Sequence, residues 1–261
     1  MPPLVTLTTD FGARDPYVAA MKGVMFKICP GIQIVDLSHD IAPQDVLQGA
    51  LFLAGAAAYF PEGTIHCAVV DPGVGTDRLA LAASAGGQVF VCPDNGLLTL
   101  FLRNHALTEA RAITNPAFML DTISPTFHGR DVFAPAAASL ARGTPLEAAG
   151  ERVDDVQRLE IPEAATEGSG DVSGAVIHID RFGNCITNIH RTLVGEPAGT
   201  TVCIGHHRLP GIHQTYGDVA PGAPLALFGS SEYLEIAVNQ RDAAAELGIA
   251  AGDKIRLTTG R

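Results

Sequence analysis

Acidic residues directly follow apolar segments of this chain, and they are the first candidates for chemistry. The apolar run Ile65–Val70 predicts a buried strand, and Asp71 and a Pro-Gly turn come next. The β-branched run Leu4–Thr9 ends in the same way at Asp10. In an open α/β sheet, ligands bind beyond the carboxyl ends of the strands. Carboxylates at these two positions are therefore candidate site residues.

The turn after Asp71 carries further signals. Gly73 and Gly75 let the backbone approach a ligand closely, and Arg78 can fold back toward Asp71. An ordinary surface ion pair within a turn would explain the same residues. Other polar residues stand at turns or strand ends, among them Asn95, His128, Asp180, Asn184 and Ser230. Each alone fits turn chemistry, and only their joint occurrence favours a site.

Several familiar site motifs are missing. The sequence has no phosphate-binding Gly-x-x-x-x-Gly-Lys-Ser/Thr, no complete dinucleotide fingerprint, no His-Glu-x-x-His and no Gly-x-Ser-x-Gly. Nine histidines are scattered, and the adjacent pair His206-His207 would point apart on a strand. We therefore expect no metal site.

The amino-acid composition indicates a globular protein and argues against some classes of binding partner. Of 261 residues, 47% are hydrophobic and 17% charged, which permits a sizeable core. The net charge of −11 argues against nucleic acid and anionic membrane surfaces as partners. The five cysteines form no Cys-x-x-Cys pair, and we see neither a signal peptide nor an apolar run long enough to span a membrane. These features favour a cytoplasmic protein.

Residues 1–142 alternate between strand and helix patterns. Strands are predicted at 4–9, 32–37 and 65–70, with helices at 17–27 and 43–59 between them. Asp15 is the expected N-cap of the first helix, with Pro16 at its first position. This order predicts an α/β domain with a doubly wound, largely parallel sheet.

The remainder of the chain has a different character. Residues 143–170 are acidic and weakly periodic, so we assign them as a linker. Residues 171–261 contain short β runs separated by glycines and one short helix at 241–247, which predicts a smaller all-β barrel domain.

Six motifs follow one another in an order that is specific as a set. They resemble the S-adenosyl-L-methionine (SAM) hydroxide adenosyltransferases, or adenosine-forming SAM hydrolases, which are relatives of the SAM-dependent fluorinase and chlorinase. The motifs occupy residues 8–12, 15–23, 69–78, 93–96, 126–135 and 180–188. The resemblance implies hydrolysis of SAM to adenosine and L-methionine without a cofactor. It also implies an α/β domain, a C-terminal β-barrel and a homotrimer with active sites between subunits.

The resemblance also carries residue roles. Asp71, Arg78 and His128 match the set assigned to water activation, and Asp10 matches the carboxylate that holds the ribose hydroxyls. Asp15, Asp180 and Ser230 match positions around the methionine end, and Asn184 matches an adenine contact. The remaining substrate-binding positions are Tyr17, Asn95, Phe182, Ser231 and Asn239.

Three alternatives stay open at this point. The halogenases carry Tyr at the position of Asp71, Thr at that of Val74 and Ser at that of Gly129, so this chain has the hydrolase residues. It departs from the family at Leu79, where an Arg-Arg pair is common, and at Ser231, where halogenases use Arg for the carboxylate. A non-catalytic SAM or adenosine sensor and a metal-dependent hydrolase are the other two.

Overall fold

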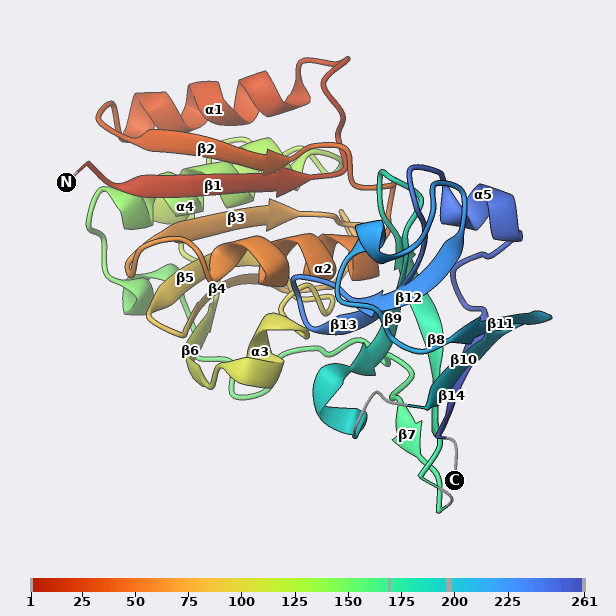
Figure 1. Cartoon of the computed structure of the whole chain (residues 1–261). Helices are drawn as coiled ribbons and strands as arrows, with labels where there is room; N and C mark the ends of the chain where they lie inside the picture. Colours follow the sequence, from red (N-terminus) through yellow and green to blue (C-terminus); the bar gives the residue numbers. More distant parts are fainter. Residues whose placement is uncertain (1, 169, 196–198, 260–261) are drawn as a thin grey trace. The chain divides into compact units, whose positions relative to one another are not determined.

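The computed structural model describes residues 2–168, 170–195 and 199–259. The chain forms two compact units, Met1–Leu159 and Glu160–Arg261 (Figure 1). Each unit has its own buried apolar side chains. Within the described residues, no helix is both long and apolar enough to cross a membrane.

The first unit is a six-stranded mixed sheet with helices. Strands β2, β1, β3 and β5 run parallel, and β4 lies antiparallel between β5 and β6, in the order β2-β1-β3-β5-β4-β6. The elements are β1 (Leu4–Thr9), α1 (Tyr17–Ile28), β2 (Gln33–Ser38), α2 (Val46–Ala57), β3 (Ile65–Val69), β4 (Ala80–Ala85), β5 (Gln88–Pro93), α3 (Phe101–Asn104), β6 (Leu107–Ala112) and α4 (Ala134–Ala141).

Helices cover both faces of this sheet because its central strands are apolar on both sides. In β3, Cys67 and Val69 pack into a core with residues of α1 and α4. Ala68 and Val70 point the other way and pack with residues of α2 and α3. This alternation is what a strand buried on both faces requires.

Two helix starts differ from the sequence-based expectation. Helix α1 begins at Tyr17 with Pro16 as its cap residue, and no side chain caps it, so the predicted cap at Asp15 is wrong. The first helical bond runs from Ala20 N–H to the Pro16 carbonyl, one residue later than expected. Helix α2 begins three residues later than predicted because Asp45 caps it, accepting a 2.9 Å bond from Gln48 N–H.

The acidic segment after α4 bonds to the first unit as far as Leu159. Ala112 N–H donates to the Glu151 carbonyl at 2.8 Å, and Val153 N–H to the Ala110 carbonyl at 2.9 Å. Gln157 N–H donates to Asp94 Oδ1 at 2.8 Å. The segment predicted as a linker, 143–170, thus includes a stretch that lies along β6.

The second unit is an antiparallel, nearly closed barrel-like sheet in the order β11-β10-β14-β8-β9-β13-β12, with β7 paired to β8. Beyond β11, a bridge joins His213 to Leu227 of β12 at the other end of this order. The elements are β7 (Ala165–Thr166), β8 (Val172–Ile179), β9 (Cys185–His190), β10 (Thr200–Ile204), β11 (His207–Pro210), β12 (Pro224–Phe228), β13 (Tyr233–Val238), α5 (Ala243–Leu247) and β14 (Lys254–Thr259).

The predicted divergence of His206 and His207 is wrong. Gly205 (φ 55°) and His206 form the turn of the β10–β11 hairpin, so the two histidines do not share one strand. Their ring centroids lie 3.9 Å apart.

Candidate functional site

The first unit has a cavity of about 320 Å³ beyond the carboxyl ends of β1 and β3, which we call the N-terminal pocket. Asp10 enters it from the end of β1, and Asp71 from the end of β3. Tyr17, the first residue of α1, and His128 also line it. Four of the residues predicted from the sequence are therefore brought together here.

Asp71, Arg78 and His128 form one connected set. Arg78 Nε donates to both carboxylate oxygens of Asp71, at 3.0 and 3.1 Å, and its Nη2 donates to Asp71 Oδ2 at 2.5 Å. The same Nη2 lies 2.8 Å from His128 Nδ1. The side chains of Asp71 and Arg78 are only 5% and 11% exposed, so this ion pair is largely withdrawn from solvent.

This geometry decides which His128 nitrogen carries the proton. A guanidinium can only donate, so Nδ1 must accept and the neutral ring must hold its hydrogen on Nε2. Burial, and next the positive charge of Arg78, lower the pKa of His128 below its usual range. At neutral pH His128 thus offers a hydrogen-bond donor, Nε2–H, and no free acceptor.

The two loops that carry these residues interlock. Gly75 has φ +77°, and a Cβ built on it would lie 2.5 Å from the Pro125 carbonyl oxygen. His128 directly precedes a π-helical turn, Gly129–Phe133, of the kind often found at functional sites. Asp131 in this turn is buried and accepts a 2.8 Å bond from Ser124 N–H, which holds the loop before His128.

Asp10 is oriented by a strained residue. Its Oδ2 accepts a 2.8 Å bond from the backbone N–H of Gln44, a non-glycine residue with φ 67°. Backbone strain of this kind clusters at functional sites. Asp15, by contrast, is exposed and lines neither this cavity nor the others described below.

Asn95 lies on the other side of Arg78. It lines a separate cavity of about 400 Å³ with Arg78 and Asp94, and not the N-terminal pocket. Its Nδ2 donates to the carbonyl of Val70 at 2.8 Å. Asn95 therefore supports the backbone that presents Asp71.

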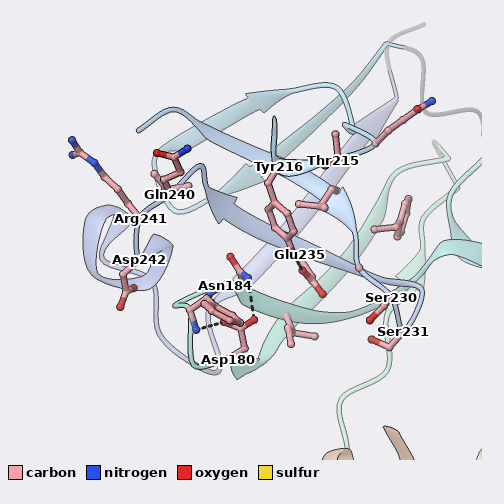
Figure 2. A pocket seen from close by; sticks show the side chains of 17 residues that line it. Asp180, Asn184, Thr215, Tyr216, Ser230, Ser231, Glu235, Gln240, Arg241 and Asp242 are labelled. Atoms are coloured by element: carbon pink, nitrogen blue, oxygen red, sulfur yellow. Dashed lines mark hydrogen bonds between the residues drawn. The ribbon is translucent and has the colours of Figure 1, made fainter. Parts of the chain in front are cut away.

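The second unit contains a larger cavity of about 1020 Å³, the C-terminal pocket (Figure 2). Asp180, Phe182, Asn184, Ser230 and Ser231, all predicted from the sequence, line it. Asp180 Oδ1 accepts from Phe182 N–H and Asn184 N–H, and its Oδ2 accepts from Asn184 Nδ2 at 2.9 Å. Because Nδ2 is committed to Asp180, the amide oxygen of Asn184 is the atom left to accept from a ligand.

Asn239 does not line this pocket, although Val238 and Gln240 on either side of it do. It is buried, and its Nδ2 donates to the Val219 carbonyl at 2.7 Å. Its observed contact is internal to the unit.

The C-terminal pocket also contains a polar pair that was not predicted from the sequence. The Tyr216 hydroxyl donates to Oε2 of the buried Glu235 at 2.9 Å, and Figure 2 draws the two side chains together. Burial, and next the bond to Glu235, raise the pKa of Tyr216 to about 12. Burial also raises the pKa of Glu235. The sequence did contain a sign of this pair, because the charged residue Glu235 interrupts the apolar run of β13 and charged residues are rarely buried without a partner.

Metal-ligating side chains do not gather in the described part of the chain. No group of three or more His, Cys, Asp or Glu residues there could hold a metal ion.

Two family models cover most of the sequence. One, described as the SAM hydroxide adenosyltransferase N-terminal domain, matches residues 5–150, and its C-terminal counterpart matches residues 174–256. The chain belongs to the SAM hydroxide adenosyltransferase family, which confirms the predicted resemblance.

Individual relatives agree with this assignment. The (R)-S-adenosyl-L-methionine hydrolase of Thermus thermophilus is 45% identical over 97% of this chain and 98% of its own. The hydrolase of Salinispora tropica is 41% identical over 99% of this chain and 98% of its own. A fluorinase of Nocardia brasiliensis is 32% identical over 99% of this chain and 97% of its own. A crystal structure described as an uncharacterized conserved protein from Thermotoga maritima has a TM-score of 0.90 at 36% identity, covering 97% of this chain and 99% of that one.

Proposed function

We propose that this protein hydrolyses SAM at the ribose 5′ carbon, releasing adenosine and L-methionine. The observation that carries the proposal is the connected Asp71–Arg78–His128 set beside the N-terminal pocket. Relatives named as SAM hydrolases, 38–45% identical over 97–99% of this chain, support it.

The sulfonium of SAM is a good leaving group, so the enzyme's task is to place and activate a water. In the proposed mechanism His128 Nε2–H donates to the water oxygen, and Asp71 accepts a water proton with a lone pair that Arg78 leaves free. The water oxygen forms a bond to C5′ as the C5′–S bond breaks. The electron pair of the C5′–S bond stays on sulfur, which leaves as the uncharged thioether of L-methionine. Arg78 holds both partners in place through its hydrogen bonds.

Substrate contacts follow from the same proposal. Asp10, held by Gln44 N–H, accepts hydrogen bonds from the ribose hydroxyls. The Asn184 amide oxygen accepts from the adenine amino group, and Ser230 and Ser231 lie near the methionine end. Asp180 acts by orienting Asn184. The roles of Asp15 and Asn239 have no support from their positions, since one is exposed outside the pockets and the other bonds internally.

A halogenase is the second candidate, and two observations favour the hydrolase. Asp71, Val74 and Gly129 are the hydrolase residues at the three positions that differ. The T. thermophilus and S. tropica hydrolases align over 262 and 263 positions, whereas the N. brasiliensis fluorinase needs 293, more than the 261 residues of this chain. The fluorinase therefore has segments without a counterpart here.

The decisive experiment incubates the purified protein with SAM in ¹⁸O-labelled water, with and without fluoride or chloride. We expect adenosine that carries one ¹⁸O at its 5′ hydroxyl, unlabelled methionine, and no effect of halide. Asp71→Asn serves as the control for contaminating activity. A 5′-halogenated nucleoside would identify a halogenase, and unchanged SAM with tight binding would identify a sensor.

The proposed reaction needs no cofactor, because the leaving group is already activated in the substrate. Dialysis against EDTA should therefore leave turnover unchanged. Loss of activity that Zn²⁺ or Mg²⁺ restores would favour the metal-dependent alternative.

We further propose a cytoplasmic homotrimer with substrate sites between subunits. The trimer rests on the family resemblance, and the cytoplasmic location is supported by five free cysteines, four of them buried. Light scattering at micromolar concentration tests the assembly. A monomeric mass with full activity would contradict it.

A further inference from the structure

Three aromatic rings line the N-terminal pocket together, and we call them the aromatic corner: Phe11, Tyr17 and Phe127. Their ring centroids lie 5.2 to 6.0 Å apart. The ring planes meet at 67° to 82°, so each ring is close to perpendicular to the other two. In each pair the edge of one ring faces the other ring. None of these three residues is fully buried, and Tyr17 is 47% exposed.

The charges around the corner favour a cationic ligand. Asp10 and Asp71 share the pocket with the rings, but the negative charge of Asp71 is offset by its ion pair with Arg78. Within the described residues, no Lys or Arg lies within ion-pair distance of Asp10, so its charge is available to the pocket. One protein cation already uses this cluster, since Arg130 lies over the Phe127 ring with its Cζ 4.9 Å from the centroid. That arginine is paired with Asp131.

We propose that the aromatic corner, together with Asp10, binds the positively charged sulfonium centre of the substrate. The inference rests on the proposed function, which supplies a substrate with that charge. Ring faces attract cations that lack hydrogen-bond donors, and groups of aromatic rings recognise quaternary ammonium in the same way. A sulfonium has no N–H to donate, so hydrogen-bonding residues cannot distinguish it from an uncharged thioether. Tyr17 and Phe11 offer the ring surface, because Arg130 already occupies one face of Phe127.

Binding the sulfonium in this way affects affinity more than rate. The positive charge disappears as the C5′–S bond breaks, so the attraction to the rings weakens toward the transition state. An interaction that is stronger in the ground state lowers KM without raising kcat. Loss of a ring should therefore raise KM for SAM, with a smaller change in kcat.

The experiment compares SAM with S-adenosyl-L-homocysteine, which lacks the methyl group and the charge. For Tyr17→Leu we expect KM for SAM to rise by about 2- to 30-fold, while Ki for S-adenosyl-L-homocysteine changes by less than about twofold. Tyr17→Phe keeps the ring and should retain the wild-type selectivity. Phe11→Leu is the second test variant. The matched control is Tyr59→Leu, because Tyr59 lies just after α2 and is 84% exposed.

Each outcome is informative. A selective loss for SAM in both leucine variants, retained in Tyr17→Phe, supports the inference. Equal losses for the two ligands mean that the rings contribute only apolar area, and no loss means that they do not touch the substrate, so either result overturns it. Failure of the wild-type protein to turn over or bind SAM would instead overturn the proposed function, and the inference with it. Melting temperatures identify any variant that fails to fold.

Discussion

Arg78 joins Asp71 and His128, the two side chains of the proposed water site, through hydrogen bonds. Its guanidinium lies between the Asp71 carboxylate and His128 Nδ1, and it cannot accept a proton from either. The set is therefore polarised, with an acceptor at Asp71 and a donor at His128. General-base catalysis by His128 would require it to give up the bond to Arg78.

This polarity predicts the titration of His128. Burial disfavours the charged ring, and protonation of Nδ1 would also break its bond to Arg78, so His128 should titrate below its usual pKa of about 6.5. The single-turnover rate should be constant above that pKa and fall as pH drops through it, because the neutral ring is the competent form. NMR titration of the His128 ring measures the pKa directly.

Arg78→Met should raise the pKa of His128, since it removes the adjacent positive charge and leaves Asp71 in place. The pKa of His66, which lies in the same unit and bonds elsewhere, serves as the internal control. An unchanged pKa of His128 in this variant would contradict the assigned contact.

Gly75 is the residue that lets the loops carrying Arg78 and His128 interlock. Gly75→Ala should lose about 1–2 kcal/mol of stability from its left-handed backbone conformation, and in addition its Cβ would strike the Pro125 carbonyl, 2.5 Å away. The loop that carries His128 must then move, so we expect a large fall in the single-turnover rate. Gly63→Ala is the matched control, because Gly63 has φ +80° and open space around it. If both variants keep the wild-type rate, the interlock has no catalytic role.

Among the elements, β1, β3, β5 and the end of α2 are joined by a buried polar network around His66. Thr6 Oγ1 lies 2.7 Å from His66 Nδ1, and His66 Nε2 bonds to Gln88 Oε1. Gln88 Nε2 donates to the carbonyls of Ala57 and Phe60. The Gln88 amide can accept only through its oxygen, so His66 carries a hydrogen on Nε2. Burial lowers the pKa of His66, so at neutral pH the ring is uncharged and Nδ1 accepts from the Thr6 hydroxyl.

This network predicts how stability depends on pH. Burial lowers the pKa of His66 to about 4 in the folded protein, compared with about 6.5 in the unfolded chain. The contribution of the neutral His66 ring to the free energy of unfolding is fully present above pH 6.5. The free energy of unfolding should fall by up to about 1.4 kcal/mol per pH unit between pH 6.5 and 4, because the unfolded state takes up a proton there. Urea denaturation across this range measures the slope. His66→Leu should flatten it, and an equal slope in the variant would show that other groups cause it.

At the scale of the whole molecule, charge should influence substrate capture. The chain carries a net charge of −11, and SAM is a net cation near pH 7, whereas S-adenosyl-L-homocysteine is neutral overall. A negative protein attracts the cation over distances comparable with the Debye length, and salt screens this attraction.

Raising sodium acetate from about 50 to 500 mM should therefore raise KM for SAM by about two- to fivefold. Ki for S-adenosyl-L-homocysteine is the control and should change little. Acetate is used because chloride would be a reactant for a halogenase. An equal change for both ligands would point to a general salt effect on the protein.

The sequence by itself determined the features that depend on near neighbours in the chain. Apolar runs predicted β1 and β3, and Asp10 and Asp71 could be placed after these strands because turn chemistry is local. The order of the six motifs was sufficient for the family. Element boundaries were predicted less well, since Pro16 rather than Asp15 is the cap residue of α1, and His206 occupies a turn.

Only the tertiary structure decided which distant groups meet and in what chemical state. Arg78 and His128 are 50 residues apart, Tyr17 and Phe127 come from a helix start and a loop, and Tyr216 reaches Glu235 from another segment. Residues up to Leu159 bond to the first unit despite their linker-like composition. Such contacts arise from the packing of whole elements, which no local propensity encodes. Packing also sets the burial and neighbouring charge that lower the pKa of His128 and make it a donor.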